Sequence, residues 1–308
     1  MQKNNEISKG GRQKIAFSFQ VKTNKIINII QQNNIQSWQN IQAEVSQSLN
    51  LNVSVDTIIR RAKENQIQGY LPLKKPLLNQ EKANKRLDFA INIKKQLDSK
   101  NLNLKNFIFT DETKLRLFQS EVSGNVYIKC KKEERLEPKN VIGSVKYGGG
   151  GICFWGSISY VGVGELHMIQ ENITGEIYSK QILEKALVNS LQKMNINVKD
   201  AIIFEDLDPK HSMRCKTSEN TAKKMNFNIV QDYPPASPDV NPIENIWSLL
   251  KGQITKQAPS SLQELEKISQ KKWMRFNKDR YSVLKNLILS FPRRIEEVIQ
   301  SKGWYTKY

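Results

Sequence analysis

The sequence contains little cysteine and little histidine, and each scarcity excludes a class of site. Its three cysteines, Cys130, Cys153 and Cys215, are widely spaced and odd in number, so neither a disulfide framework nor a cysteine-rich zinc site is indicated. The two histidines, His167 and His211, are too few for a histidine-rich zinc centre. We therefore expect inert thiols, and a catalytic metal, if present, held by oxygen ligands.

The sequence also lacks long apolar runs, and it has too few acidic residues to balance its Lys and Arg. No stretch approaches the roughly 18 apolar residues of a membrane-spanning helix, and the polar start, MQKNN, is not a secretory signal peptide. Against 48 Lys and Arg stand 30 Asp and Glu, which gives a formal net charge of +18. Such a surplus repels itself unless a polyanion neutralises it. We expect a soluble, intracellular protein with nucleic acid as its partner.

Residues 1–70 predict a small helical module behind a flexible basic arm. The arm, residues 1–20, is polar, lacks periodic apolar positions and carries Arg12 and Lys14 as candidate DNA contacts. Residues 21–70 show helical periodicity, and we expect three short helices arranged as a helix-turn-helix DNA-binding domain.

The last of these helices has the composition of a recognition helix. It follows Ser54, a favourable N-cap, and its candidate contacts to DNA are Thr57, Arg60, Arg61 and Lys63. An ordinary amphipathic helix with a solvated charged face explains the same pattern. Pattern alone slightly favours that second interpretation.

Beyond this module the chain predicts a basic linker and an α/β domain. Residues 71–100 contain the linker, with Lys74 and Lys75 as candidate DNA contacts, and a helix. From residue 101 short apolar strands alternate with helices, and the expected strands cover 107–110, 126–128, 152–158, 164–169, 201–204 and 228–230. This order predicts a ribonuclease H-like mixed sheet flanked by helices at 101–252, with a C-terminal helical extension at 253–308.

Acidic residues at two strand ends and on a helix after Pro242 have the chemistry of a two-metal site. Cleavage of a phosphodiester needs two hard cations about 3.5–4 Å apart, and carboxylates suit Mg²⁺ and Mn²⁺. Two or three carboxylates compete at each strand end, and spacing does not decide between them. The competitors are Asp111 and Glu112 at the first strand, and Glu205, Asp206 and Asp208 at the second.

Three segments carry a more specific signal. Residues 109–112 read FTDE, residues 204–211 read FEDLDPKH, and residues 237–247 read SPDVNPIENIW. In this order they resemble the catalytic segments of the DDE transposases of the Tc/mariner superfamily, Tc-like branch, in which the third catalytic residue is Glu. The likeness covers nearly the whole chain, since residues 21–70 also resemble the second of the family's two helix-turn-helix units.

The resemblance implies site residues and an activity. It makes Asp111, Asp206 and Glu244 the catalytic residues and the ligands of two Mg²⁺ or Mn²⁺ ions. The side chains that it places in support are Asp208, His211 and Asn241. It further implies cut-and-paste DNA transposition and integration, terminal inverted repeats and TA target sites as DNA partners, a homodimer, and a nuclear location.

Two departures from the family pattern bear on activity. Leu207 stands where the family usually has Asn, and the GRQK at residues 11–14 resembles a degenerate linker between the two helix-turn-helix units. Because 10 residues precede Gly11, the first unit is expected to be absent. The alternative is a truncated or domesticated derivative that binds DNA without cutting it. A third hypothesis, a ribonuclease H acting on RNA–DNA hybrids, is disfavoured by the helix-turn-helix pattern.

Overall fold

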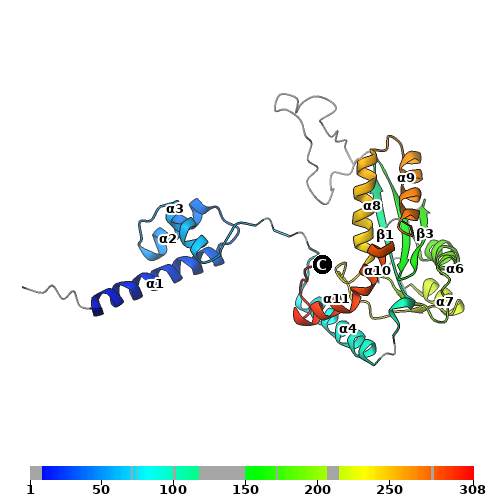
Figure 1. The fold of residues 1–308 in the computed structure, drawn as a ribbon, viewed down its shortest axis with the longest axis horizontal. Coiled ribbons are helices and arrows are strands. Elements are labelled where there is room, and N and C mark those ends of the chain that lie inside the picture. The colour runs from blue at the N-terminus through cyan, green and yellow to red at the C-terminus, as the bar shows by residue number, and fades with distance from the viewer. Residues whose placement is uncertain are drawn as a thin grey trace, which may run out of the picture. The chain divides into compact units, whose positions relative to one another are not determined.

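The chain folds into two compact units, Met1–Lys74 and Lys75–Tyr308, as a computed structural model shows (Figure 1). The structure describes residues 9–70, 72–73, 75–99, 102–117, 150–170, 173–206, 215–278 and 281–308, with side chains from residue 21 onward. In these ranges no helix is long and apolar enough to cross a membrane.

The first unit consists of three helices around a small apolar core, as expected for a helix-turn-helix domain. They are α1 (Lys9–Gln32), α2 (Trp38–Leu49) and α3 (Val55–Glu64). The side chain of Ser37 accepts a hydrogen bond from the backbone N–H of Asn40, and that of Ser54 from Thr57, so both later helices begin at the N-caps that the sequence supplies. The core that holds the three helices together contains Ile26, Ile29, Ile30, Ile41, Val45, Ile58 and Ala62.

The prediction of a flexible arm at residues 1–20 is wrong from residue 9 onward, because α1 begins at Lys9. The buried isoleucines near the end of α1 fix that part of the helix. Once a helix exists, each further residue adds one backbone hydrogen bond, so it extends through polar sequence that has no apolar pattern of its own. The GRQK segment lies inside this helix rather than in a linker. The side chains of Arg12 and Lys14 lie outside the described ones.

The second unit is built on a mixed sheet, which confirms the predicted fold class. In its described part the strand order is β3-β2-β1-β4-β5. β1 (Phe107–Arg116), β2 (Gly151–Ser159) and β3 (Gly162–Ile169) are antiparallel neighbours, whereas β4 (Ile202–Phe204) and β5 (Asn228–Ile229) continue the sheet in parallel. The strand predicted at 126–128 falls outside the described residues.

β1 is longer than predicted. The sequence suggested that the strand ends before Asp111, but β1 continues to Arg116 because β2 pairs with it along the whole of that stretch, with Leu115 opposite Ile152. The backbone is therefore paired with β2 both before and after Asp111, which fixes the position of this residue. A short 3₁₀ turn, η1 (Leu104–Asn106), leads into the strand.

Helices cover both faces of the sheet (Figure 1). Phe107 and Phe109 point to one face and Ile108 to the other, as strand alternation requires. The face of Phe109 is covered by α4 (Gln80–Asp98), α8 (Ile243–Gln257), α9 (Leu262–Arg275), α10 (Tyr281–Leu289) and α11 (Phe291–Gln300). The face of Ile108 is covered by α5 (Gly175–Ile177), the π-helical segment η5 (Tyr178–Leu187), α6 (Val188–Lys193) and α7 (Lys216–Lys224).

The C-terminal helices are part of this unit. The sequence suggested a separate extension at 253–308, but Trp273 of α9 and Phe291 of α11 are fully buried in the core below β1. Phe291 packs against both Phe109 and Phe204, with ring centroids 5.1 and 5.2 Å away. Without α9–α11, this face of the sheet would lose much of its apolar cover.

A buried ion pair joins four distant segments of the second unit. Arg86 of α4 donates to both carboxylate oxygens of Asp239, at 2.9 and 2.7 Å, and its Nε donates to the carbonyl of Gly303 at 2.8 Å. Arg294 of α11 donates to the backbone carbonyl of Asp239, and Thr306 donates to its carboxylate. The loop before α8 is therefore tied to α4, to α11 and to the chain's last residues.

The partners of Asp239 together outweigh its unfavourable burial. Burial raises the pKa of the carboxyl group, but the hydrogen bonds and charge of Arg86, the hydrogen bond from Thr306 and the charge of Lys75 together lower it below its usual value. Arg86 is 1% exposed, and nothing but its partners can satisfy its guanidinium. Asp239 stands five residues before Glu244, so the pair sets where α8 begins.

We expect that Arg86→Met lowers the free energy of unfolding by about 3–5 kcal/mol, because it leaves the Asp239 carboxylate buried without its partner. Urea unfolding followed by circular dichroism measures this loss. The matched control is Lys85→Met at the neighbouring position. It breaks an exposed ion pair with Glu81 and should not measurably change the free energy of unfolding. If Arg86→Met itself does not fold, the double variant Arg86→Met/Asp239→Leu should, since an apolar pair can replace a buried ion pair. Equal stability of the two single variants would contradict the role of the pair.

Candidate active site

Three of the predicted acidic residues converge beside the central strand. Phe109 of β1 lies opposite Phe204 of β4 in a parallel pairing, and Asp111 and Asp206 each follow two residues later. Glu244 stands in the first turn of α8, which packs on β1. The side chains of Asp111 and Glu244 share a hydrogen bond, and the charge of Asp206 acts on both.

Strand alternation separates these residues from their acidic neighbours. Asp111, like Phe109, points to the face that α8 covers. Glu112 points to the opposite face, where its charge acts on Tyr178 of η5. Glu205 is directed to Tyr178 as well, and accepts a hydrogen bond from its hydroxyl at 2.6 Å. The structure thus places Glu112 and Glu205 together, away from the Asp111–Glu244 contact.

Asn241 connects the start of α8 to the strand that carries Asp111. Its side-chain amide donates to the carbonyl of Thr110 at 3.2 Å, and its side-chain oxygen accepts from the N–H of Ile243. These two bonds hold the first turn of α8 against β1, and with it Glu244. The predicted supporting position of Asn241 is therefore a structural contact between two elements of the site. Asp208 and His211, predicted beside it, lie outside the described residues, as does Leu207.

The electrostatics of the site favour protonation in the absence of a cation. Burial raises the pKa of Asp111 well above its usual range, and the charges of Glu244 and Asp206 raise it further. Burial also raises the pKa of Glu244, although the hydrogen bond with Asp111 and the charge of Lys251 act against this. Two carboxyl groups that share a hydrogen bond need a proton between them. A divalent cation would replace that proton.

The residues present fit hard cations better than any other cofactor. Their donors are carboxylate oxygens, which Mg²⁺ prefers and Mn²⁺ accepts. Within the described part of the chain, no three acidic, histidine or cysteine side chains already surround a metal-sized space. The Asp111–Glu244 contact would have to open as the shared proton leaves.

Glu205, which competes with Asp206 at the level of sequence, is a second buried acidic group and lies behind the site. Burial raises the pKa of Glu205 to about 7; the hydrogen bond from Tyr178 lowers it and the charge of Asp206 raises it. One of its carboxylate oxygens is buried without a partner among the described residues. The sequence did hold a signal, since strand alternation places Glu205 opposite to Asp206.

A glycine next to Asp111 makes room for two stacked tryptophans. Gly156 of β2 lies opposite Asp111, and a Cβ at this position would come within 2.6 Å of the ring of Trp247 and 3.0 Å of that of Trp273. The two rings stack with centroids 5.0 Å apart and Trp247 is buried, so its ring serves core packing. Helices α8 and α9 therefore rest directly on the strand beside the site.

The predicted DNA contacts on α3 differ in their surroundings. Arg60 and Lys63 are exposed, whereas Arg61 pairs with Glu64 at 2.6 Å and the hydroxyl of Thr57 shares a hydrogen bond with Ser54. In the second unit, the ammonium group of Lys75 donates to the carbonyl of Tyr308. Lys74 is outside the described residues.

A mixed sheet with helices on both faces, and three acidic side chains gathered beside its central strand, defines the ribonuclease H-like class of α/β domains. Similarity to known proteins agrees with this class. The paired-end complex of Mos1 transposase with the left transposon end superposes with a TM-score of 0.72 at 16% identity, over 92% of this chain and 80% of that one. The Mos1 mariner paired-end complex with Mn gives 0.70 at 16% identity, over 92% and 79%.

Sequence comparison identifies the family. Residues 23–95 match a Tc3-type helix-turn-helix family model described as a transposase. The Tc1 transposase of Caenorhabditis elegans is 30% identical over 258 residues, which are 82% of this chain and 87% of that protein. The Tcb2 transposase of Caenorhabditis briggsae is 27% identical over 285 residues, or 92% and 98%. The chain belongs to the Tc1/mariner superfamily of transposases.

We expect that Asp111→Asn raises the melting temperature of the metal-free protein, because an amide donates to Glu244 without the cost of protonating a buried carboxyl group at neutral pH. For a unit of this size, each kcal/mol gained in this way corresponds to about 2–4 °C. Differential scanning calorimetry at neutral pH with EDTA measures the shift. Asp200→Asn, an exposed change just before β4, should leave the melting temperature unchanged. A lower melting temperature for Asp111→Asn would contradict the raised pKa of Asp111 in the metal-free protein.

The raised pKa of Glu205 predicts a pH dependence of stability. Its pKa is about 7 in the folded protein against a model value of 4.5, so its contribution to stability is fully present below about 4.5 and is lost as the pH rises through about 7. Glu205→Gln should flatten the fall in stability of the metal-free protein between these values. Tyr178→Phe removes the donor that favours the charged form, and should move the fall to higher pH. Unfolding midpoints across this range that are parallel for all three proteins would contradict the assignment.

Proposed function

We propose that this transposase catalyses cut-and-paste DNA transposition, with Asp111, Asp206 and Glu244 as its catalytic residues. As a member of its family it is a DNA nuclease and strand transferase. The observation that carries the finer proposal is the convergence of these three carboxyl groups, from β1, from the end of β4 and from α8, on one face of the sheet.

The site would become ready for metal ions through changes in its own side chains. Asp111 and Glu244 lose their shared proton and turn their oxygens toward the space between them. Asn241 keeps the first turn of α8 in place during this change, and Lys251 offsets part of the negative charge near Glu244. Two Mg²⁺ or Mn²⁺ ions, when bound, supply activation of the attacking oxygen and stabilisation of the leaving oxygen.

The reaction that this site supports has two steps. Water attacks the phosphorus at the element's end, the bond to the 3′ oxygen breaks, and a free 3′-hydroxyl remains. That hydroxyl then attacks a target phosphorus in line, the target's bond from phosphorus to its 3′ oxygen breaks, and a target 3′-hydroxyl leaves, so that the element's 3′ oxygen is joined to the target's 5′ phosphate. A TA target has a physical rationale, because TA steps are flexible and easily kinked.

The partners follow from the same proposal. The helix-turn-helix unit, with Arg60 and Lys63 exposed on α3, would bind the terminal inverted repeat. Mos1 transposase forms paired-end complexes with transposon ends, which supports a homodimer that holds two ends. Action on chromosomal DNA supports a nuclear location.

The test is metal-dependent nicking by the purified protein on a duplex that carries the inverted repeats flanking its own coding sequence. We expect nicking with Mn²⁺ or Mg²⁺ and none with EDTA. Asp206→Asn should lower the rate at least 10³-fold and leave DNA binding intact, because the lost group acts in chemistry only. Asp200→Asn is the matched control and should cut at the normal rate. Binding to the repeats without nicking in either metal would favour the alternative, a derivative that binds DNA without cutting it.

A further inference from the structure

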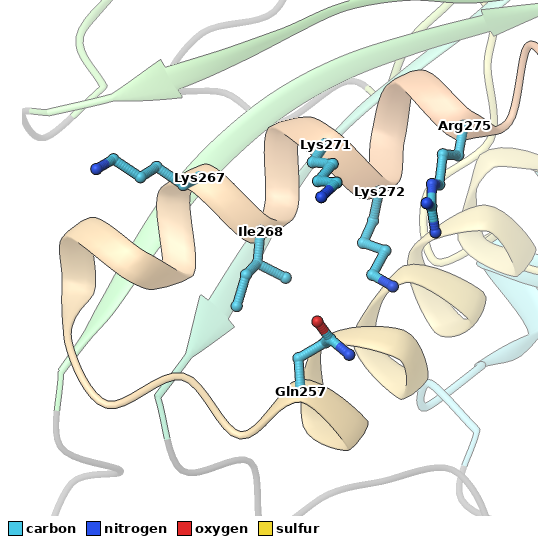
Figure 2. A pocket seen from close by; sticks show the side chains of 6 residues that line it. All are labelled: Gln257, Lys267, Ile268, Lys271, Lys272 and Arg275. Atoms are coloured by element: carbon cyan, nitrogen blue, oxygen red, sulfur yellow. The ribbon is translucent and has the colours of Figure 1, made fainter.

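A basic groove lies between the end of α8 and the outer side of α9. It has a volume of about 420 Å³ and is lined by Gln257, Lys267, Ile268, Lys271, Lys272 and Arg275. Figure 2 shows Ile268, Lys272 and Arg275 pointing from α9 toward α8, with Gln257 pointing back from the end of α8. Four of the six lining residues are cationic and none is acidic.

The lysines of this groove are not neutralised within the described structure. No described carboxylate forms an ion pair with Lys267, Lys271 or Lys272, and Lys267 and Lys271 are exposed. Positive charges held close together repel each other unless an anion lies between them. The groove therefore favours a ligand that brings several negative charges at once.

Helical geometry turns these cations into a regular row. Lys267, Lys271 and Arg275 are spaced four residues apart, so they rise about 6 Å from one to the next along one side of α9. The other side of α9 is fixed in the core: Trp273 is fully buried and donates from its indole nitrogen to the carbonyl of Gly164 at 3.0 Å. The row is thus presented by a rigid helix.

The groove has a fixed relation to the proposed active site. Trp247 of α8 stacks on Trp273 of α9, and both rings lie over Gly156, the partner of Asp111. Along α8, Gln257 is 13 residues beyond Glu244, or about 20 Å at 1.5 Å per residue. That length equals about six base pairs of duplex at 3.4 Å each. A duplex held in the groove could reach the carboxylates within about one helical turn.

The lining also indicates which form of nucleic acid fits. Sites for single strands stack bases on aromatic side chains, and among the described residues no aromatic side chain lines this groove. Lysine ammonium groups act on phosphates as point charges and carry no sequence information there. The chemistry is that of a duplex backbone held without regard to sequence.

We propose that the groove formed by α8 and α9 binds the phosphate backbone of duplex DNA, independently of sequence and apart from the helix-turn-helix unit. The inference rests on the proposed function, because it gives the second unit its own binding site for the DNA that the carboxylates cut. It assigns Lys267, Lys271 and Lys272 a role in binding and none in the chemistry.

The experiment compares two triple variants of the full chain with equal net charge. Lys267→Gln/Lys271→Gln/Lys272→Gln removes charge from the groove. Its control removes three exposed lysines from helices on the other face of the sheet, as Lys180→Gln/Lys216→Gln/Lys224→Gln. The affinity for a random-sequence 40-base-pair duplex is measured between about 50 and 200 mM salt in EDTA, so that no cleavage occurs.

We expect the slope of log K against log salt to become shallower by about 2–3 for the groove variant, since each lost phosphate contact contributes about 0.9. The control should keep the slope of the wild type. A charge-preserving variant, in which the same three groove lysines become Arg, should restore it. This last result separates loss of charge from damage to the fold.

Equal slopes for the groove variant and its control would overturn the proposal. So would a groove variant that loses binding to polyglutamate while keeping its binding to DNA, since the groove would then be a site for acidic peptide. The proposed function is tested by a separate result. If the protein does not nick DNA with Mn²⁺ but the slopes still differ, the proposed function is contradicted and DNA binding by the groove is supported. If nicking is normal but the slopes are equal, only DNA binding by the groove is contradicted.

Discussion

The buried ion pair between Arg86 and Asp239 is the interaction on which the catalytic unit's arrangement depends most. It connects α4, the loop before α8, α11 and the last residues of the chain, and the hydrogen bond from Arg86 to Gly303 spans 217 positions. A buried charge is tolerated only when its partners satisfy it fully, and here the guanidinium is hydrogen-bonded on every side. Because the pair fixes the loop, Pro242 and Glu244 begin α8 at a defined place beside β1.

The fixed position of α8 keeps together carboxyl groups whose proximity is electrostatically unfavourable. Asp111 and Glu244 are drawn together although the charge of Glu244 disfavours the charged form of Asp111, and the charge of Asp206 disfavours the charged form of both. Strand pairing on both sides of Asp111 and the bonds of Asn241 hold the carboxyl groups where solvent alone would separate them. In the proposed function this strain is useful, because a divalent cation held by these carboxylates would relieve it and would couple metal binding to stability.

Helix α9 illustrates how one element serves two purposes. Its inner side contributes Trp273 to the stack over Gly156, and its outer side presents the basic row of the groove. The stack makes the spacing between groove and carboxylates a property of the fold rather than of flexible side chains. The helix-turn-helix unit and the groove would then divide DNA binding between sequence recognition and general attraction to phosphate.

Local sequence determined the elements and the identity of the candidate ligands. Short apolar runs, proline placement and the N-cap at Ser54 predicted the order and type of most strands and helices, since these signals act over a few residues. Motif resemblance indicated Asp111, Asp206 and Glu244. Only the tertiary structure decided what depends on partners far along the chain: the extension of β1 by pairing with β2, the opposite faces of Asp111 and Glu112, the place of α9–α11 in the core, and the role of Arg86. Such contacts bring together residues up to about 200 positions apart, and no local periodicity records them.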